Sequence, residues 1–254
     1  GFLGHHLVTH FLTYIPPSGR GPVEKVIVYS RDEYKQAMMK EEFPDPRLRL
    51  FLGDVRDKER LLRAVEGVQC IIHAAALKRV DAVAYDPEEV IKTNILGTWN
   101  VLHAAYTHRV PRTILISSDK ACYPINVYGA SKLMAEHLVI TANIYGYPQG
   151  CRSSVVRYGN VLGSRGSVVE IWRRQVAEGK PLTLIDPQAT RFIVTPTQAV
   201  QTIQWAIETL QGGEIFLPPF RSVQMEALAR EVGGPLEISP PRSGGEKVHE
   251  TLVT

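Results

Sequence analysis

Residues 113–132 read TILISSDKACYPINVYGASK, and this stretch decides the fold class. It opens with an almost uninterrupted apolar run, 113–117, which is typical of a strand buried on both faces of a parallel sheet. Residues 127–145 have the apolar spacing of a helix, as do residues 87–108. The alternation predicts an α/β fold in which helices cover both faces of a parallel sheet. Further strands are predicted at 25–29 (KVIVY), 47–52 (RLRLFL), 68–73 (VQCIIH) and 154–157 (SVVR).

The pattern changes after Asn160, which divides the chain into two regions. Residues 1–160 are predicted to form a Rossmann-like doubly wound parallel sheet that binds NADP. Residues 161–254 are predicted to be mainly a smaller C-terminal substrate-binding subdomain, with some segments returning to the main sheet. Because the chain opens on Gly1-Phe2-Leu3-Gly4 with no strand before it, the first strand is expected to lie upstream. After Asn160 the sequence predicts helices at 168–178, 196–210 and 223–232 and strands at 182–185 and 214–217.

Composition narrows the class of protein. The chain has 254 residues, 44% of them hydrophobic and 22% charged, as in ordinary globular proteins. No apolar run approaches the roughly 18 residues of a membrane span. A formal charge of +3, with the basic residues scattered along the chain, does not favour nucleic-acid binding. The three cysteines form no CxxC pair and no secretory leader is seen, so a cytoplasmic protein without disulfides is expected.

The first residues have the pattern of the end of a dinucleotide-binding loop. Two glycines three residues apart, before a helical stretch, let the backbone approach a pyrophosphate at a helix N-terminus. A simple turn is the alternative, since the preceding strand and first glycine of the full motif are absent. The candidate pyrophosphate-binding residues are Gly1, Phe2, Leu3 and Gly4.

The ends of the next predicted strands supply further cofactor candidates. Ser30 and Arg31 follow the strand at 25–29, and an arginine there can pair with the extra phosphate of NADP. The neighbouring Asp32 leaves NAD open, because an acidic residue would bind the ribose hydroxyls. Residues 53–55 could meet the adenine and residues 74–76 could let the cofactor approach the backbone, or both could be ordinary turn and core residues. The candidates there are Asp54, Val55, Ala74 and Ala75.

Tyr128 and Lys132 are four residues apart, so on a helix they lie on the same face. An unperturbed tyrosine titrates at about pH 10, and a neighbouring ammonium favours the phenolate. We therefore expect Lys132 to lower the pKa of Tyr128 and make it a base for a sugar hydroxyl, while also holding the cofactor ribose. Ser118, at the end of the preceding strand, is expected to hydrogen-bond the same sugar hydroxyl.

The pair Asp119-Lys120 separates two possible reactions. Epimerisation needs hydride transfer and one proton carrier, whereas eliminating water from a sugar needs an additional acid and an additional base. Lys120 is the candidate base, with a pKa lowered by burial and by the charge of Lys132, and Asp119 is the candidate acid. In a regular strand the two side chains would point in opposite directions, so this hypothesis requires an irregular strand end. The alternative is a solvated ion pair on a loop.

Charged residues of the second region and two histidines complete the candidates. Arg191, Arg242 and Glu246 lie in predicted loops, where a nucleoside diphosphate would need neutralising charges and ribose contacts, or they are plain surface residues. His6 and His10 have the spacing of a metal-binding pair, but no third ligand accompanies them. No metal site is predicted.

Several motifs together resemble the inverting UDP-N-acetylglucosamine 4,6-dehydratases, the polysaccharide-biosynthesis branch of the extended short-chain dehydrogenase/reductases. The resemblance runs almost from end to end, and the motifs stand in that family's order. The family's C-terminal motif reads RPGEK, whereas this chain has the longer RSGGEK at 242–247. The motifs are VIVYSRDE (26–33), AALK (75–78), IKTNILGT (91–98), SSDKACYPINVYGASK (117–132), VRYGNVLGSRGSV (156–168), TRF (190–192), GGEIFLP (212–218) and GEKVHE (245–250).

The resemblance implies a reaction. Tyr128 takes the proton of the sugar C4 hydroxyl while NADP accepts the C4 hydride. Lys120 then removes the C5 proton, Asp119 protonates the departing C6 hydroxyl, and the hydride returns to C6 while C5 is reprotonated on the opposite face. The product is a UDP-linked 4-keto-6-deoxy sugar for surface polysaccharide or glycan precursors. A homo-oligomer is also expected, with no nucleic-acid partner and no membrane segment in this chain.

The resemblance also assigns binding residues. Those for the cofactor are Ala74, Lys78 and Val161, and those for the substrate are Lys78, Asn160, Val168, Thr183, Arg191, Arg242 and Glu246. Two other functions stay open. One is a nucleotide-sugar 4-epimerase that uses Tyr128 and Lys132 alone, and the other is a non-catalytic dinucleotide-binding protein.

Overall fold

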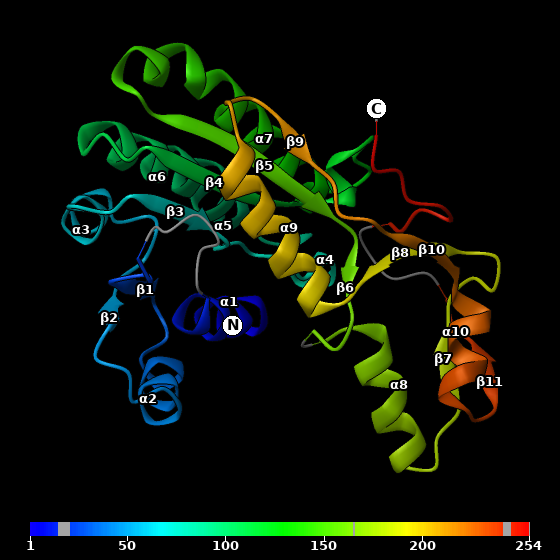
Figure 1. The fold of residues 1–254 in the computed structure, drawn as a ribbon. Coiled ribbons are helices and arrows are strands. Elements are labelled where there is room, and N and C mark those ends of the chain that lie inside the picture. Colours follow the sequence, from blue (N-terminus) through cyan, green and yellow to red (C-terminus); the bar gives the residue numbers. More distant parts are fainter. Residues whose placement is uncertain (15–20, 165, 241–244, 254) are drawn as a thin grey trace.

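The computed structural model describes residues 1–14, 21–164, 166–240 and 245–253, and a parallel sheet forms its centre (Figure 1). Four strands pair in the order β3-β4-β5-β9, all parallel, and β1 pairs in parallel with β2. Each of the five strands expected in the first region is present, within a few residues of its expected ends. The bounds are β1 Val26–Ser30, β2 Leu48–Leu52, β3 Cys70–His73, β4 Arg112–Ser118, β5 Arg152–Tyr158 and β9 Ile215–Phe216.

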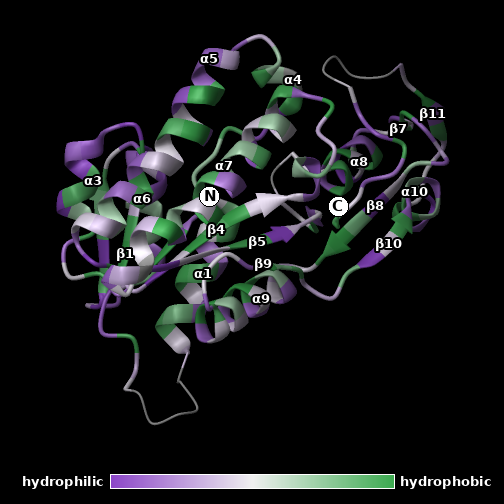
Figure 2. Cartoon of the chain, turned by 90° about the horizontal axis from the view of Figure 1, so that it is seen from above, coloured by the Kyte–Doolittle hydropathy of each residue, from purple (hydrophilic) through white to green (hydrophobic). Residues whose placement is uncertain are grey.

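Helices cover both faces of this sheet because its strands are apolar on both sides. Ile114 and Ile116 of β4 pack in one cluster with Leu7 of α1 and Ile203 of α9. Leu115, which points the other way, packs against α6 and α7. Seen from above (Figure 2), α1 and α9 lie on one side of the sheet and α6 and α7 on the other, which confirms the doubly wound α/β fold. The bounds are α1 Phe2–Thr13, α6 Gly97–Thr107, α7 Val127–Gly146 and α9 Pro196–Thr209.

The helix expected at 87–108 is present but not uniform. It begins as α5 (Pro87–Val90), continues as a π-helical stretch, Ile91–Leu96, and ends as α6. The wider π-helical turn contains the buried Asn94. The remaining short elements of the first region are α2 Glu33–Glu42, α3 Lys58–Ala64, α4 Val80–Val83, a 3-10 turn Asp119–Ala121 and a second 3-10 turn Tyr147–Gln149.

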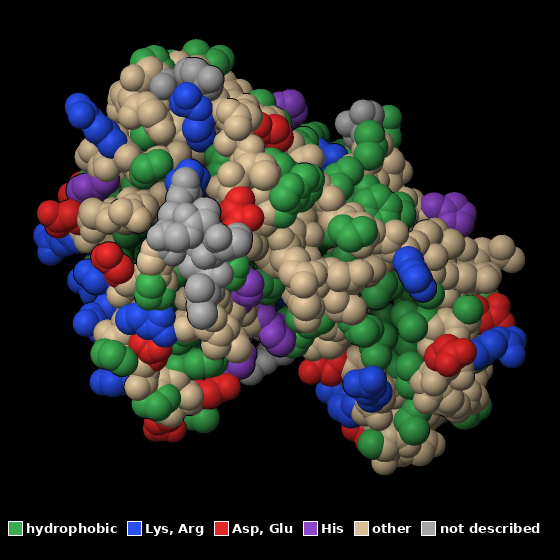
Figure 3. Space-filling view, viewed as in Figure 1, with side chains coloured by type: hydrophobic (Ala, Val, Ile, Leu, Met, Phe, Trp, Pro, Cys, Tyr) green, Lys and Arg blue, Asp and Glu red, His purple; other side chains and the backbone are tan. Residues whose placement is uncertain are grey.

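The second region builds a smaller layer beside the sheet. A three-stranded sheet has the order β10-β8-β6, and β7 pairs in parallel with β11. Helices α8 and α10 pack there around the fully buried Trp172. The space-filling view has a notch between the lobe that carries α2 and the lobe that carries α8 (Figure 3). The bounds are β6 Asn160–Val161, α8 Val168–Ala177, β7 Leu182–Leu184, β8 Thr190–Val194, β10 Arg221–Gln224, α10 Met225–Val232 and β11 Leu236–Ile238.

This layer contains the main departures from the expected elements. The helix expected from 223 starts at Met225, because 221–224 instead pair antiparallel with β8. Strands β6, β8, β10 and β11 were not expected, since they are short and carry polar residues. Within the described residues, no helix is long and apolar enough to cross a lipid bilayer.

Candidate active site

The turn after β4 brings neighbouring polar side chains together. Beyond Ser118 the chain leaves the strand and makes the 3-10 turn Asp119–Ala121. The Ser118 hydroxyl donates to Asp119 Oδ1 at 2.8 Å, and the Lys120 Nζ lies 3.2 Å from the same oxygen. Asp119 has no exposed surface, so the pair is not the solvated loop pair of the alternative interpretation. The irregular strand end that the two-carrier hypothesis requires is therefore present.

Helix α7 packs directly against this turn. A Cβ atom at Gly129 would lie 2.3 Å from the Lys120 carbonyl oxygen, so only glycine permits this approach. The backbone N–H of Gly129 donates to Asn126 Oδ1 at 2.8 Å, which caps the start of the helix. The close contact places Tyr128, at the start of α7, beside the turn.

Tyr128 is buried, and the groups around it differ from those expected. Burial raises its pKa above the ordinary value, whereas the charge of Lys120 and a hydrogen bond with Ser118 lower it. The net shift is upward, and the cation that acts on the phenol is Lys120. The expectation that Lys132 lowers the pKa of Tyr128 is therefore not confirmed. Lys132 instead donates to the Ile116 carbonyl at 2.5 Å, and burial lowers its own pKa to about 8.

The expected lowering of the Lys120 pKa is wrong. Burial is the largest single influence and lowers the pKa, as expected, but the charges of Asp119 and Glu250 raise it and the net shift is upward. The Lys120 Nζ lies 3.4 Å from Glu250 Oε1. Lys120 is thus held as an ammonium between two carboxylates.

Two residues of this site had no assigned role in the sequence interpretation. Glu250 is buried, yet its sequence neighbours read as a polar loop and nothing in its spacing points to Lys120. Asn94 donates to Ser131 Oγ at 2.9 Å and pairs with both backbone groups of Leu77. Because Ser131 in turn donates to the Tyr128 carbonyl at 2.7 Å, Asn94 ties the start of α7 to the chain after β3. The only sequence feature that could have pointed to Asn94 was its position in the motif IKTNILGT.

The N-terminal residues form the start of helix α1. Gly1 is the N-cap of α1, and in the described structure no side chain caps this helix and no acidic residue lies in its first turn. Added Cβ atoms at Gly1 and Gly4 would meet nothing within 4 Å, so there is open space beside this helix start. Ala74 and Ala75 are exposed directly after β3. A helix start with free room and no negative charge fits a pyrophosphate.

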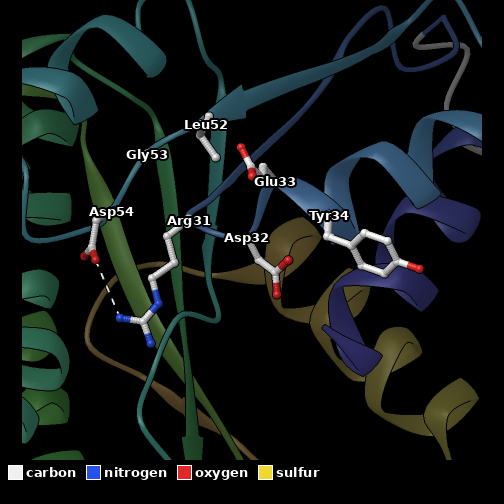
Figure 4. Close-up of a pocket in the computed structure, with 7 residues that line it drawn as sticks. All are labelled: Arg31, Asp32, Glu33, Tyr34, Leu52, Gly53 and Asp54. Carbon is white, nitrogen blue, oxygen red and sulfur yellow. Dashed lines mark ion pairs between the residues drawn. The ribbon is translucent and has the colours of Figure 1, made fainter.

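A shallow pocket of about 570 Å³ lies at the ends of β1 and β2, lined by residues 31–34 and 52–54 (Figure 4). The Arg31 side chain is 56% exposed and its guanidinium lies 3.6 Å from Asp54 Oδ2. Asp54 also accepts from Arg56 at 2.7 Å. Ser30, just before the pocket, receives a hydrogen bond from Gln36, whereas Val55 is buried in the core against α3 and α6. The site residues of the described chain include no group of three metal-binding side chains.

The expected substrate residues lie in or beside the smaller layer. Arg191 is buried on β8, where it donates to the Val248 carbonyl at 3.0 Å and lies 3.4 Å from Glu246. Thr183 Oγ1 faces Gln175 of α8. Lys78 is exposed after β3, Asn160 and Val161 form β6 beside β8, and Val168 begins α8. Arg242 lies outside the described residues.

Comparisons with known proteins identify relatives of this chain. A family model described as "Polysaccharide biosynthesis protein" matches residues 1–254. The chain is similar to a UDP-N-acetylglucosamine 4,6-dehydratase (inverting) of Campylobacter jejuni subsp. jejuni, 44% identical over 91% of this chain and 70% of the relative. It is also similar to a UDP-glucose 4-epimerase of Rickettsia massiliae, 37% identical over 91% and 70%.

A solved structure extends the similarity to the fold. Pen from Bacillus thuringiensis has a TM-score of 0.92 and 34% sequence identity, covering all of this chain and 81% of that one. Its match spans both the parallel sheet and the smaller layer. The chain belongs to the polysaccharide biosynthesis protein family.

Proposed function

We propose that the protein removes water from a UDP-N-acetylhexosamine, giving a 4-keto-6-deoxy sugar with inverted configuration at C5. The observation that carries this proposal is the buried contact of Asp119 with both Ser118 and Lys120 on one turn, beside Tyr128. Epimerisation does not require an acid and an amine held together at this place. The family description and the dehydratase relative support the same reaction and a product used for polysaccharide precursors.

The proposed cofactor is NADP. The first turn of α1 would hold the pyrophosphate, the exposed Arg31 the 2′-phosphate and Lys132 the nicotinamide ribose. When bound, the oxidised nicotinamide accepts a hydride from C4 of the sugar, later returns it to C6, and by its positive charge favours a phenolate nearby.

Tyr128 would take the proton of the C4 hydroxyl. Its phenol already has two neighbours that favour deprotonation, the Lys120 charge and the hydrogen bond with Ser118, which act against the effect of burial. The keto group formed at C4 makes the C5 proton acidic. Removing that proton and releasing the C6 hydroxyl as water then need one base and one acid.

Asp119 and Lys120 would become that acid and base by one proton transfer between them. In the resting pair Lys120 is an ammonium, because its pKa is raised by Asp119 and Glu250 more than burial lowers it. Moving one proton across the 3.2 Å from Nζ to Oδ1 leaves an amine and a carboxylic acid. The amine takes the C5 proton and the acid protonates the C6 hydroxyl, so the pair regains an ammonium and a carboxylate. Burial favours this exchange, since it replaces two charges by neutral groups. C5 then takes one proton on its opposite face as C6 receives the hydride, and this proton balances the one that Tyr128 took from the C4 hydroxyl.

The substrate's nucleotide end is proposed to bind along the smaller layer. Glu246, at the edge of the segment that Arg191 holds, is suited to the ribose hydroxyls. Lys78 and Asn160 would contact the pyrophosphate and sugar from the ends of β3 and β6. Val168, Thr183 and Arg242 remain assigned by the family resemblance alone.

The decisive experiment is to incubate the protein with UDP-N-acetylglucosamine and NADP and to identify the product by mass spectrometry and NMR. Loss of one water with inversion at C5 is expected, and Lys120→Met should lower this rate at least about 100-fold while cofactor binding persists. The control is Lys180→Met, which removes an exposed lysine far along the chain. A C4 epimer without loss of water would instead establish the epimerase, and cofactor binding without turnover the non-catalytic alternative.

Cofactor choice has its own test. Arg31→Ala should weaken NADP binding at least about tenfold and leave NAD binding nearly unchanged, because only NADP carries the extra phosphate. Arg56→Ala is the matched control, since Arg56 also pairs with Asp54 but does not line the pocket. If calorimetry shows equal effects of Arg31→Ala on the binding of both cofactors, Arg31 does not determine the preference for NADP over NAD.

A further inference from the structure

Residues 245–252, here named the C-terminal strap, run from the smaller layer to the turn at 118–121. This turn is called the catalytic turn below. Lys247 Nζ donates to the Cys122 carbonyl at 2.5 Å, directly after the 3-10 turn. The next residue, Val248, accepts at its carbonyl from the Thr190 N–H at 3.0 Å. At the far end Arg157 of β5 donates to the Leu252 carbonyl at 2.7 Å. The strap is therefore fixed to β8, to the catalytic turn and to the main sheet.

Glu250 of the strap reaches the catalytic turn from below the surface. Its side chain is only 3% exposed, and its two oxygens lie beside two lysines. One carboxylate oxygen lies 3.4 Å from the Lys120 Nζ and the other lies 3.3 Å from the Lys247 Nζ. Each oxygen thus faces one ammonium.

We propose that Glu250 is a positioning residue that holds the Lys120 amine beside Asp119 and Tyr128. The inference deepens the proposed function and rests on it for its consequence in catalysis. Geometry supports it, because Asp119 alone would contact the ammonium at one oxygen and leave the lysine free to swing about it. A second, buried carboxylate on the opposite chain segment fixes where the amine points.

The titratable groups around Lys120 come from three different segments of the chain. The titratable groups that act on the ammonium are Asp119 on its own turn, Glu250 on the strap and Tyr128 on α7. Lys247 pairs with Glu250 from the other side, so this carboxylate keeps a partner when Lys120 loses its proton. The proposed proton exchange is between Lys120 and Asp119, and Glu250 keeps its contact with Lys247 throughout.

The first test measures the titration of Lys120 without any substrate. Wild type and variants are labelled briefly with acetic anhydride over a range of pH, and mass spectrometry reports the modified fraction of Lys120, which is partly exposed. Glu250→Gln should lower the Lys120 pKa by about 1 to 3 units, because it removes one of two opposite charges at similar shape. Glu250→Asp keeps the charge and should give a smaller decrease.

The matched control is Glu214→Gln. Glu214 is a partly buried carboxylate that accepts from Ser154 and from the Gly212 backbone at the opposite end of β5. Its loss should destabilise the fold without moving the Lys120 titration. A merely structural role for Glu250 predicts the same pattern in Glu250→Gln, that is, lower stability and an unchanged Lys120 pKa.

Kinetics provides the second readout. Glu250→Gln should lower kcat for UDP-N-acetylglucosamine about 10- to 100-fold and change KM less than about twofold, since only the placement of the amine is altered. An unchanged Lys120 titration in Glu250→Gln overturns the inference, and where that variant does not fold, an unchanged titration in Glu250→Asp does so. A lowered pKa in a protein whose wild type performs no dehydration supports the positioning role and overturns the proposed function, so the two failures are distinguishable.

Discussion

The catalytic turn and the C-terminal strap contribute charged groups to the same site in different ways. The turn, 118–121, follows a strand of the main sheet and is pressed against α7, so its side chains are placed by local chain geometry. The strap forms no helix and is placed by individual polar contacts to β8, β5 and the turn. The difference teaches that the identity of the reacting groups is local, whereas the pKa of Lys120 depends both on its neighbour Asp119 and on Glu250, which is distant in sequence.

The largest effect on stability is expected when the contact between the strap and the main sheet is removed. Arg157 is buried with Glu136 at 2.6 Å and also donates to the strap at Leu252. Arg157→Met leaves Glu136 as a buried charge without its partner and should lower the free energy of unfolding by about 3 to 5 kcal/mol. Urea unfolding measures this loss.

Arg230→Met is the matched control for that variant. Arg230 pairs with Glu226 on the surface of α10, and its removal should change stability by less than about 1 kcal/mol. Similar losses in the two variants would mean that the buried pair contributes no more than a surface pair.

The pH dependence of stability tests Lys132, which lies on the helix that packs against the turn. In the folded protein, burial lowers the pKa of Lys132 to about 8, below the ordinary lysine value of 10.5. Between these pH values the unfolded chain binds one more proton than the folded chain, so stability rises with pH. The unfolding free energy of wild type relative to Lys132→Met should therefore increase by up to about 3 kcal/mol from pH 8 to 10.5. A difference that stays flat over this range would show that Lys132 is not depressed in the folded protein.

The smallest expected effect tests the contact between the turn and α7. Gly129→Ala forces apart the helix and the Lys120 carbonyl and should lower stability by about 1 to 3 kcal/mol. The rate of dehydration should fall with it, because Tyr128 and Lys120 move relative to each other. Gly21→Ala is the control, since a Cβ there meets nothing within 4 Å. Equal melting temperatures for the two variants would contradict the close approach.

Local patterns were sufficient for the strands and helices of the main sheet. The apolar run at 113–117 and the helical spacing after residue 127 each depend on neighbours in sequence, and the structure has both. The hypothesis that Asp119 and Lys120 act together required an irregular strand end, and the chain has such an end in the turn at Asp119. Short strands such as β8 and β10 were not predicted, because they are defined by their pairing with each other and have no alternating apolar pattern.

The protonation of the site could not be predicted in the same way. Burial of Lys120 was expected and does lower its pKa, but the charges of Asp119 and Glu250 raise it, and Glu250 lies in a segment that sequence spacing does not connect to Lys120. Likewise, Tyr128 is four residues from Lys132, yet that amine donates to Ile116 and a lysine on another element acts on the phenol. The sign of a pKa shift depends on three-dimensional neighbours.

The strap also bears on how the enzyme matures. A chain leaving the ribosome can complete β4, the turn and α7 while the residues that hold Lys120 from the other side are still unsynthesised. Until Glu250 has emerged and folded back, the amine lacks its second carboxylate. A nascent or C-terminally clipped molecule would therefore keep the main sheet but lack a fully organised reaction centre.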